Sequence, residues 1–225
     1  VRALQPAFPT LTFPNHYSIA TGLLPQRHGI VGNRFPDADR ARWYRMTDRD
    51  AVQDGRWYGG EPIWVTAEKQ GLRSAAYYFV GTEADVGGVR PSYWRLFDET
   101  VPGAVRVDQV LRWLRLPAEE RPRFVTLYFE TVDSQTHAFG VGSPESIAAI
   151  AEVDRLVGRL QAGLSELPFA DEVYLIVVSD HGMGAYGPSA PLVLDRVIDL
   201  DGVQLVEGGS YAFLYFEDDR LERAR

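Results

Sequence analysis

The chain has 225 residues, 45% of them hydrophobic and 24% charged, a composition typical of one large globular domain or two small ones. It contains no cysteine, which excludes a disulfide framework, a thiolate zinc site and a cysteine nucleophile. Its net charge of −8 has the wrong sign for a protein that holds a nucleic-acid polymer by its phosphates. Apolar runs such as Val173 to Val178 are far shorter than the roughly 18 residues that a membrane span needs.

The first predicted element is a helix that runs to Thr21 and ends at Gly22. Thr12 is expected at the N-cap of this helix or just before it, because a proline follows two residues later and prolines suit the first helical turn. A second helix is expected over Pro62 to Gln70, where a glycine follows and closes it. The short apolar run from Ala75 to Val80 predicts a strand.

Two strands separated by a long helix follow. Phe124 to Phe129 and Val173 to Ser179 are nearly continuous in apolar residues, as is typical of strands covered on both faces. Between them, Ser143 and the proline after it start a helix whose apolar residues recur at helical spacing to Leu167. This order predicts a parallel sheet with helices on its faces, an α/β fold. A further strand is predicted over Tyr211 to Phe216.

Two acid–histidine pairs follow the ends of these strands. Asp133 and His137 are four residues apart, so both side chains face one cation if the segment is helical. Asp180 and His181 come directly after a predicted strand. Both pairs are therefore expected at the carboxyl edge of the sheet, where active sites of such folds lie. Either pair alone could be a capping or solvated carboxylate beside an unrelated histidine, whereas both together favour two bound dications. Dications could let an acidic protein bind a small phosphate ester.

The hydroxyl of Thr12 has two interpretations. It could simply cap the first helix. Alternatively it could be a nucleophile, because the positive end of the helix dipole and a bound dication would both lower its pKa. Thr10 and Thr21 are rival hydroxyls, but Thr10 lies further from the helix start and Thr21 falls within the helix.

Together, these motifs resemble those of a known family. The run FPTLTFPNHY from Phe8 to Tyr17, together with Thr21-Gly22-Leu23, Pro25, His28-Gly29-Ile30 and Asn33, resembles the nucleotide pyrophosphatase/phosphodiesterases of the alkaline phosphatase superfamily. The segment Gly59 to Trp64 and the two acid–histidine pairs also resemble that family, in the same order along the chain. The resemblance extends to about Met183. It implies an alkaline phosphatase-like α/β fold with a mostly parallel central sheet and helices on both faces.

The resemblance also implies roles for the polar residues. Thr12 matches the nucleophile that forms a covalent phosphothreonine intermediate, and Asn33 matches the amide that hydrogen-bonds the phosphoryl oxygens beside the backbone N–H of Thr12 or of the next residue. Two zinc ions are implied as cofactors. The ligands in this chain are Asp133 and His137 for one zinc, and Asp180, His181 and Thr12 for the other.

Three aromatic residues match positions that hold a nucleotide base in this family: Phe13, Phe97 and Tyr128. Ordinary core packing is the alternative for all three, since aromatic residues make up 12% of the chain. His16 and His28 match histidines that are structural in this family, so they are not expected to bind metal.

Some of the family's pattern has no counterpart here. One more aspartate, from a strand before the nucleophile segment, and one more histidine, after the second pair, are expected outside this chain. We therefore expect residues 1–225 to be a single catalytic domain truncated at both ends and impaired by itself. Thr136 stands where the family usually has glycine, and Val80-Gly81-Thr82-Glu83 replaces Pro-Gly-Ser-Glu.

The implied function is hydrolysis of phosphodiester or pyrophosphate bonds in a small-molecule phosphate ester, with nucleotides as the expected substrates and an extracytoplasmic location, periplasmic or secreted. Two alternatives stay open: a phosphomonoesterase or phosphonate hydrolase of the same superfamily, and a non-catalytic binding module that keeps the fold. A sulfatase is disfavoured because its nucleophile derives from cysteine, which the chain lacks.

Overall fold

The computed structural model of the protein describes residues 4–38, 41–185, 187, 192–207 and 211–216. The strands are β1 (Arg34–Pro36), β2 (Trp43–Arg45), β3 (Ser74–Tyr77), β4 (Tyr93–Arg95), β5 (Phe124–Leu127), β6 (Val203–Glu207) and β7 (Ala212–Phe216). The α-helices are α1 (Thr12–Thr21), α2 (Pro25–His28), α3 (Arg49–Gln53), α4 (Ile63–Lys69), α5 (Gly103–Leu114), α6 (Thr131–Phe139) and α7 (Pro144–Ser165). Short 3-10 helices cover Gly55–Trp57, Ala170–Glu172 and Leu194–Arg196.

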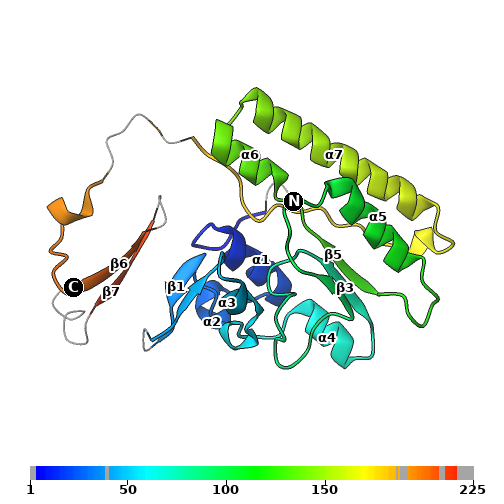
Figure 1. The fold of residues 1–225 in the computed structure, drawn as a ribbon, viewed down its shortest axis with the longest axis horizontal. Helices are drawn as coiled ribbons and strands as arrows, with labels where there is room; N and C mark the ends of the chain where they lie inside the picture. Colours follow the sequence, from blue (N-terminus) through cyan, green and yellow to red (C-terminus); the bar gives the residue numbers. More distant parts are fainter. Residues whose placement is uncertain (1–3, 39–40, 186, 188–191, 208–210, 217–225) are drawn as a thin grey trace.

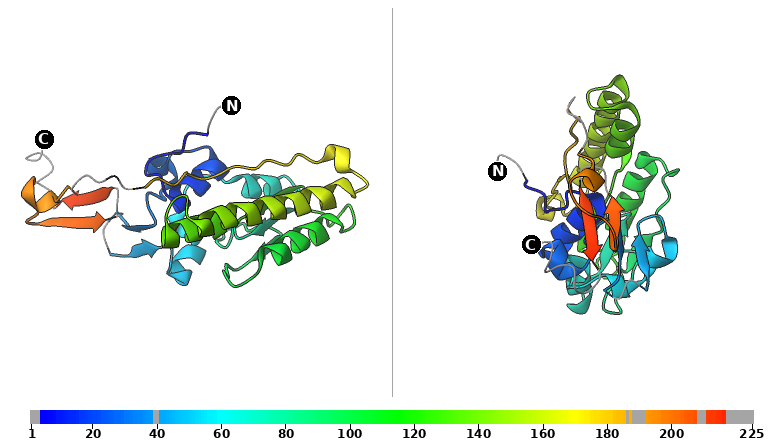
Figure 2. Two further views of the ribbon diagram at one scale, coloured as in Figure 1. Left: turned by 90° about the horizontal axis from the view of Figure 1, so that it is seen from above. Right: turned by 90° about the vertical axis from the view of Figure 1, so that its left-hand side faces the viewer.

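The centre of the fold is a parallel sheet with strand order β4-β3-β5 (Figure 1). On one face, Ala75 and Tyr77 of β3 pack in a core with α5 and α7, which run side by side in Figures 1 and 2. On the other side, Tyr17 of α1 and Trp64 of α4 centre a second core, and α4 contacts β3. Helices therefore cover both faces, as the α/β prediction requires.

The long helix α7 begins and packs as its sequence predicts. Pro144 is its first residue, and the Ser143 hydroxyl accepts a hydrogen bond from the N–H of Ser146 at 3.1 Å. Near the other end, a Cβ atom on Gly163 would lie 2.3 Å from the side chain of Leu111. Glycine at this position thus lets α7 approach α5 closely. The predicted helix near residue 63 and the strands β3 and β5 are also present, each a few residues shorter than predicted.

The prediction of a buried strand over Val173 to Ser179 was wrong. The segment forms no strand ladder with any described part of the chain, and Tyr174 and Ile176 are 92% and 81% exposed. β5 pairs with β3 alone and is only half-buried. A run of apolar residues indicates that the side chains would be stable in a buried strand. A strand also needs a neighbouring backbone for its N–H and C=O groups, and the described chain places none beside this segment.

The predicted strand at Tyr211 to Phe216 is present as β7, but it lies outside the parallel sheet. It pairs antiparallel with β6, with Val203 opposite Phe216 and Glu207 opposite Ala212. The two strands lie at one end of the molecule, beyond an extended segment (Figures 1 and 2). The strand β6 was not predicted from the sequence.

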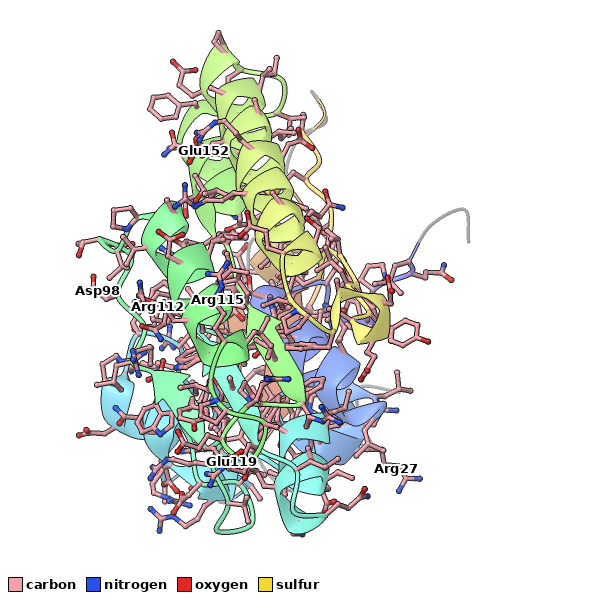
Figure 3. All side chains as sticks on the ribbon, turned by 90° about the vertical axis from the view of Figure 1, so that its right-hand side faces the viewer. Arg27, Asp98, Arg112, Arg115, Glu119 and Glu152 are labelled. Atoms are coloured by element: carbon pink, nitrogen blue, oxygen red, sulfur yellow. The ribbon has the colours of Figure 1, made fainter. Side chains whose placement is uncertain are left out.

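The exposed side chains of α5 and α7 include charged residues as well as apolar ones such as Ile147 and Ile150 of α7. Figure 3 labels three of the charged residues: Arg112 in the last turn of α5, Arg115 directly after that helix, and Glu152 on α7. Within the described ranges, no helix combines the length and the apolar character needed to cross a membrane.

His28 lies fully buried at the end of α2. Its Nε2 is 2.9 Å from the Ser18 hydroxyl, and its Nδ1 accepts a hydrogen bond from the N–H of Ile30 at 3.2 Å. Burial lowers the pKa of His28 to about 4, from 6.5 in an exposed histidine. The histidine is therefore neutral in the folded protein at neutral pH, which fits its prediction as a structural residue.

This burial predicts a pH-dependent stability. Below pH 6.5 the unfolded chain binds a proton at His28 that the folded chain does not, so the free energy of unfolding should fall as the pH drops toward 4, with a slope of up to about 1.4 kcal/mol per pH unit. Urea unfolding at pH 7 and pH 5 measures this. The His28→Gln variant should show a shallower pH dependence, and an equally steep one would contradict the prediction.

Candidate active site

Thr12 is the first residue of α1, so the helix begins one residue earlier than predicted and Leu11 occupies the N-cap position. Its hydroxyl therefore does not cap the helix. Instead the Thr12 Oγ1 atom lies 3.4 Å from Nε2 of His181, which is 169 residues away in the chain. The structure thus brings the predicted nucleophile and one of the predicted metal ligands together at the positive end of the helix dipole.

Asn15 organises the backbone that precedes Thr12, a role that sequence analysis missed. It is buried, and its Oδ1 atom accepts a hydrogen bond from the N–H of Ala7 at 2.6 Å. Its Nδ2 atom donates to the carbonyl oxygens of Pro9 and Leu11 at 3.1 Å and 3.0 Å. The sequence feature that could have predicted this role is an asparagine in the first helical turn, because side chains there point back toward the helix N-terminus.

His16 lies between Thr12 and Asp180 and contacts both of them. The His16 Nδ1 atom is 2.8 Å from the Thr12 carbonyl oxygen and 3.3 Å from Oδ2 of Asp180, and the same carboxylate oxygen is 3.3 Å from Nε2 of His181. Burial opposes ionisation of Asp180, yet the hydrogen bond and charge of His16 and the charge of His181 hold the pKa of Asp180 below its ordinary value. The carboxylate is thus ionised at neutral pH.

Asp133 and His137 lie on the helix α6, as their spacing requires. The His137 Nε2 atom is 3.5 Å from Oδ1 of Asp133. That oxygen is buried and has no hydrogen-bond partner in the described chain. A buried carboxylate oxygen without a donor is costly unless a cation binds it. The residues therefore fit a metal ion, although no three His, Asp or Glu side chains converge on one point within the described ranges.

Thr136, the departure from the family's glycine, fits into α6 without disturbing it. The side chain is buried, and its hydroxyl donates to the carbonyl oxygen of Val132 at 2.6 Å. Such a bond to the residue four positions earlier is one that threonine makes within helices. The substitution thus leaves the helical spacing of the Asp133–His137 pair intact.

Tyr128 is near both acid–histidine pairs. Its ring packs edge-on against His16 with 4.9 Å between centroids. Burial raises the pKa of Tyr128, and the negative charges of Asp180 and Asp133 raise it further. Because both carboxylates act on one phenol, the two predicted metal pairs lie in the same region of the molecule.

The other predicted substrate contacts lie around the start of α1 and on the loop after β4. The N–H of Phe13 donates to Oδ1 of Asn33 at 3.2 Å, and the amide nitrogen of Asn33 makes no hydrogen bond to another described residue. Phe13 is half-buried and packs on Tyr44 with 5.9 Å between ring centroids. Phe97 is 37% exposed and makes an edge contact with Tyr78 at 5.2 Å.

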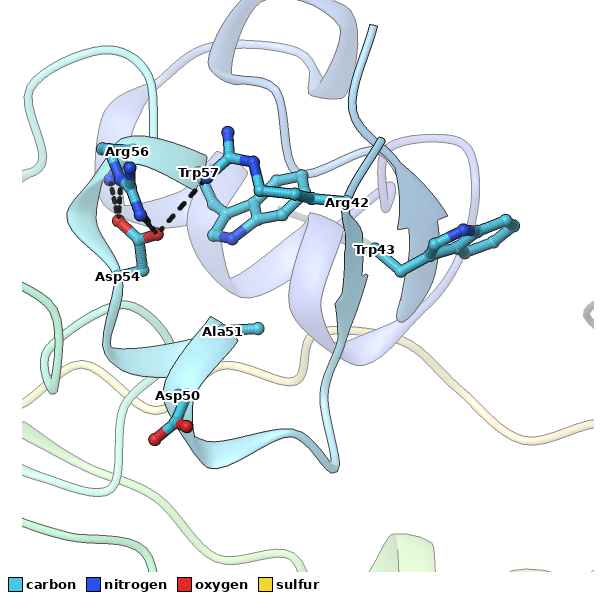
Figure 4. A pocket seen from close by; sticks show the side chains of 7 residues that line it. All are labelled: Arg42, Trp43, Asp50, Ala51, Asp54, Arg56 and Trp57. Atoms are coloured by element: carbon cyan, nitrogen blue, oxygen red, sulfur yellow. Dashed lines mark hydrogen bonds and ion pairs between the residues drawn. The ribbon is translucent and has the colours of Figure 1, made fainter. Parts of the chain in front are cut away.

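A surface pocket of about 350 Å³ lies elsewhere (Figure 4). Arg42 lies over the ring of Trp57 at 5.3 Å, and Arg56 pairs with Asp54. None of the predicted site residues lines it. The lining residues are Arg42, Trp43, Asp50, Ala51, Asp54, Arg56 and Trp57.

The family model described as type I phosphodiesterase / nucleotide pyrophosphatase matches residues 1–225. The chain belongs to this family. It is 39% identical over 206 residues to human ectonucleotide pyrophosphatase/phosphodiesterase family member 1, covering 91% of this chain and 22% of that protein. It is 41% identical over 180 residues to a venom phosphodiesterase of Crotalus durissus collilineatus, covering 80% of this chain and 22% of that protein. The chain thus spans about a fifth of the length of these curated relatives.

Solved structures in the phosphodiesterase family share the fold. Murine ectonucleotide pyrophosphatase/phosphodiesterase 5 matches 99% of this chain with a TM-score of 0.86 and 28% identity, and the match covers 59% of that chain. The same protein matches equally well as an inactive variant, with a threonine replaced by alanine, in complex with AMP. The similarity confirms the predicted alkaline phosphatase-like α/β fold.

Proposed function

We propose that residues 1–225 form part of a single catalytic domain that hydrolyses phosphodiester or pyrophosphate bonds in nucleotide-type substrates. The observation that carries this proposal is the position of the Thr12 hydroxyl. It lies at the start of α1, does not cap the helix, and is 3.4 Å from Nε2 of His181. Membership of the phosphodiesterase family supports the reaction class. The inactive threonine-to-alanine variant of the murine relative, in complex with AMP, supports both a threonine nucleophile and a nucleotide substrate.

In this mechanism, the Thr12 oxygen attacks phosphorus and forms a phosphothreonine as the leaving group departs. Water then hydrolyses the phosphothreonine from the opposite side. The amide nitrogen of Asn33, which has no partner among the described residues, donates to a phosphoryl oxygen. The N–H of Thr12 is a second donor, because it has no partner in the described chain whereas the N–H of Phe13 is engaged by Asn33. Donors aimed at developing negative charge stabilise the transition state.

Two zinc ions are the proposed cofactors. Asp133 and His137 would hold one, and Asp180 and His181 would hold the other beside Thr12. Bound there, zinc would lower the pKa of the attacking hydroxyl and neutralise charge on the phosphate. The buried Oδ1 atom of Asp133 supports the first site, because it lies 3.5 Å from Nε2 of His137 and makes no hydrogen bond within the described chain. The remaining aspartate and histidine ligands of the family pattern are proposed to lie outside this chain.

The aromatic residues would hold the base of a nucleotide. Tyr128 is near both metal pairs, Phe13 follows the nucleophile, and Phe97 has enough exposed ring surface to stack on a base. The proposed partner is therefore a small phosphate ester, with no role for a nucleic-acid polymer. We also propose an extracytoplasmic location, periplasmic or secreted, which the similarity to an ectonucleotide phosphodiesterase and to a venom phosphodiesterase supports.

The experiment that tests this function combines metal analysis with hydrolysis of bis-p-nitrophenyl phosphate. The full-length protein should contain about two zinc ions per chain and lose turnover on chelation, with recovery on adding zinc. The 225-residue piece should be impaired. Asp133→Ala should lower the zinc content by about one ion per chain. The matched control is Asp154→Ala, which removes an exposed aspartate from α7 and should leave the zinc content unchanged.

The alternatives give different results in the same assay. A phosphomonoesterase would prefer p-nitrophenyl phosphate over the diester. A non-catalytic binding module would show neither bound zinc nor turnover in the full-length protein, and that result would reject the proposal.

A further inference from the structure

Arg106 of α5 is a buried arginine that contacts three parts of the molecule. Its side chain is only 3% exposed. The Nη1 and Nη2 atoms donate to the two carboxylate oxygens of Glu130 at 2.5 Å and 2.7 Å. Nη1 also donates to the carbonyl oxygen of Tyr128 at 3.2 Å, and Nε donates to the carbonyl oxygen of Val101 at 3.0 Å. The guanidinium lies over the ring of Tyr78, 4.9 Å from its centroid.

The contact with Glu130 holds the beginning of α6. Glu130 occupies the N-cap position of this helix, and its carbonyl oxygen accepts the N–H of Ser134 at 2.9 Å. The predicted ligands Asp133 and His137 follow within the next two turns. Since a bidentate arginine–carboxylate pair fixes both distance and angle, Arg106 sets where this helix starts.

The contact with Tyr78 supports the outer part of the proposed base pocket. Tyr78 is buried and has a positive φ of 67°, a conformation that bulky residues adopt only when their surroundings hold them. Its ring packs against Phe97 at 5.2 Å. Phe97 is also held through its backbone, because its N–H donates to Oε1 of Glu83 at 3.0 Å and that carboxylate pairs with Arg49. Tyr78 and Phe97 together are called the aromatic wall below.

We propose that Arg106 is a positioning residue, which fixes the helix of the predicted metal pair relative to the aromatic wall. This inference rests on the proposed function, because it assigns the metal pair to phosphate and the wall to the nucleotide base. Arg106 itself touches neither substrate nor metal in this assignment. It acts through Glu130 on one side and through Tyr78 on the other.

A stabilising role alone does not account for this arrangement. A buried ion pair usually contributes no more to stability than a well-packed apolar pair of the same volume, because both charges lose their hydration. The ion pair instead fixes the relative positions of its partners, because one planar guanidinium contacts a carboxylate, two carbonyl oxygens and a ring at defined angles. Small displacements of groups that bind a substrate reduce rates strongly.

The test compares Arg106→Lys with Arg159→Lys in the full-length protein. Arg159 of α7 is a matched control, because it also makes a bidentate pair, with both carboxylate oxygens of Asp108 at 2.9 Å, but on the exposed α5–α7 surface. Lysine keeps the charge in both variants and loses the planar fork. Each variant is assayed at a temperature where circular dichroism shows that it is folded. The two substrates are thymidine 5′-p-nitrophenyl phosphate, which contains a nucleotide base, and bis-p-nitrophenyl phosphate, which does not.

Arg106→Lys should lower kcat on both esters by about 10-fold and weaken binding of zinc alone to a similar degree, as loss of supporting contacts around metal ligands does. Its KM should rise for the nucleotide ester and stay unchanged for the ester without a base. The Arg159→Lys variant should match the wild type in all these values. Equal kinetics and equal zinc affinity in the two variants would overturn the proposal.

Two further measurements distinguish a failure of this proposal from a folding defect and from a failure of the proposed function. Should Arg106→Lys fail to fold, Glu130→Gln keeps the side-chain size and is expected to give the same KM and kcat pattern, and wild-type values in that variant would overturn the proposal. Should the wild-type protein hydrolyse neither ester, the proposed function fails. The zinc affinity of Arg106→Lys relative to Arg159→Lys then decides about Arg106 by itself.

Discussion

Replacing Thr12 by alanine is expected to reduce hydrolysis of bis-p-nitrophenyl phosphate by at least about 1,000-fold, because the variant lacks the attacking oxygen. The fold should be unaffected. Thr12 is the first residue of α1 and its hydroxyl makes no capping bond, and alanine is the better helix former. The free energy of unfolding should therefore change little. Steady-state kinetics and urea unfolding of the full-length variant measure both quantities.

Two further substitutions sharpen this prediction. Thr10→Ala removes an exposed hydroxyl two residues earlier in the same segment and should retain wild-type turnover. Thr12→Ser keeps a hydroxyl at the same place and should retain part of the activity. Turnover near the wild-type rate in Thr12→Ala would remove Thr12 as the nucleophile. A large loss in Thr10→Ala would move the assignment to the other hydroxyl.

Replacing Asn15 by alanine is expected to affect both stability and turnover. The substitution leaves the N–H of Ala7 without an acceptor in the described chain. It also removes the side-chain hydrogen bonds to the carbonyl oxygens of Pro9 and Leu11, each of which keeps one backbone hydrogen bond. Because an unsatisfied buried group carries its full desolvation cost, the free energy of unfolding should fall by about 2–3 kcal/mol. The released segment leads directly into Thr12, so kcat/KM should fall as well.

Gln53→Ala is a matched control for this variant. Gln53 also donates from its side-chain amide to a backbone carbonyl oxygen, that of Arg49 at 3.0 Å, but it makes that bond alone and within its own helix. Its loss should cost about 1 kcal/mol or less and leave kcat/KM unchanged. If Asn15→Ala were no more damaging than Gln53→Ala, the amide would not be what holds the segment before Thr12.

The local elements of the site could be predicted because their signals are short in range. The spacing of Asp133 and His137 predicts a shared face only in a helix, and α6 is helical. Ser143 and the proline after it predict the start of α7, which the structure confirms. Helical periodicity and capping depend on residues within a turn or two, so one segment contains all the information.

Signals that depend on partners far away in the chain failed or were absent. The segment from Val173 to Ser179 has the composition of a buried strand, but strand formation also depends on a neighbouring backbone, and no described strand pairs with it. The buried pair of Arg106 and Glu130 gave no signal, because residues 24 positions apart and on separate elements show no periodicity that links them. The sequence shows Asn15 within its motif, but it does not show which backbone groups the side chain binds.

By itself, the sequence determined the family of this protein, its α/β class, and the residue types available for chemistry: one threonine at a helix start and two acid–histidine pairs. Those features depend on local spacing and on the order of motifs, which a chain carries in its covalent structure. Only the tertiary structure decided that Thr12 meets His181 across 169 residues, that His16 links Thr12 to Asp180, and that Arg106 joins α6 to the aromatic wall. Contacts of this kind arise from the packing of several elements at once, and no single segment encodes them.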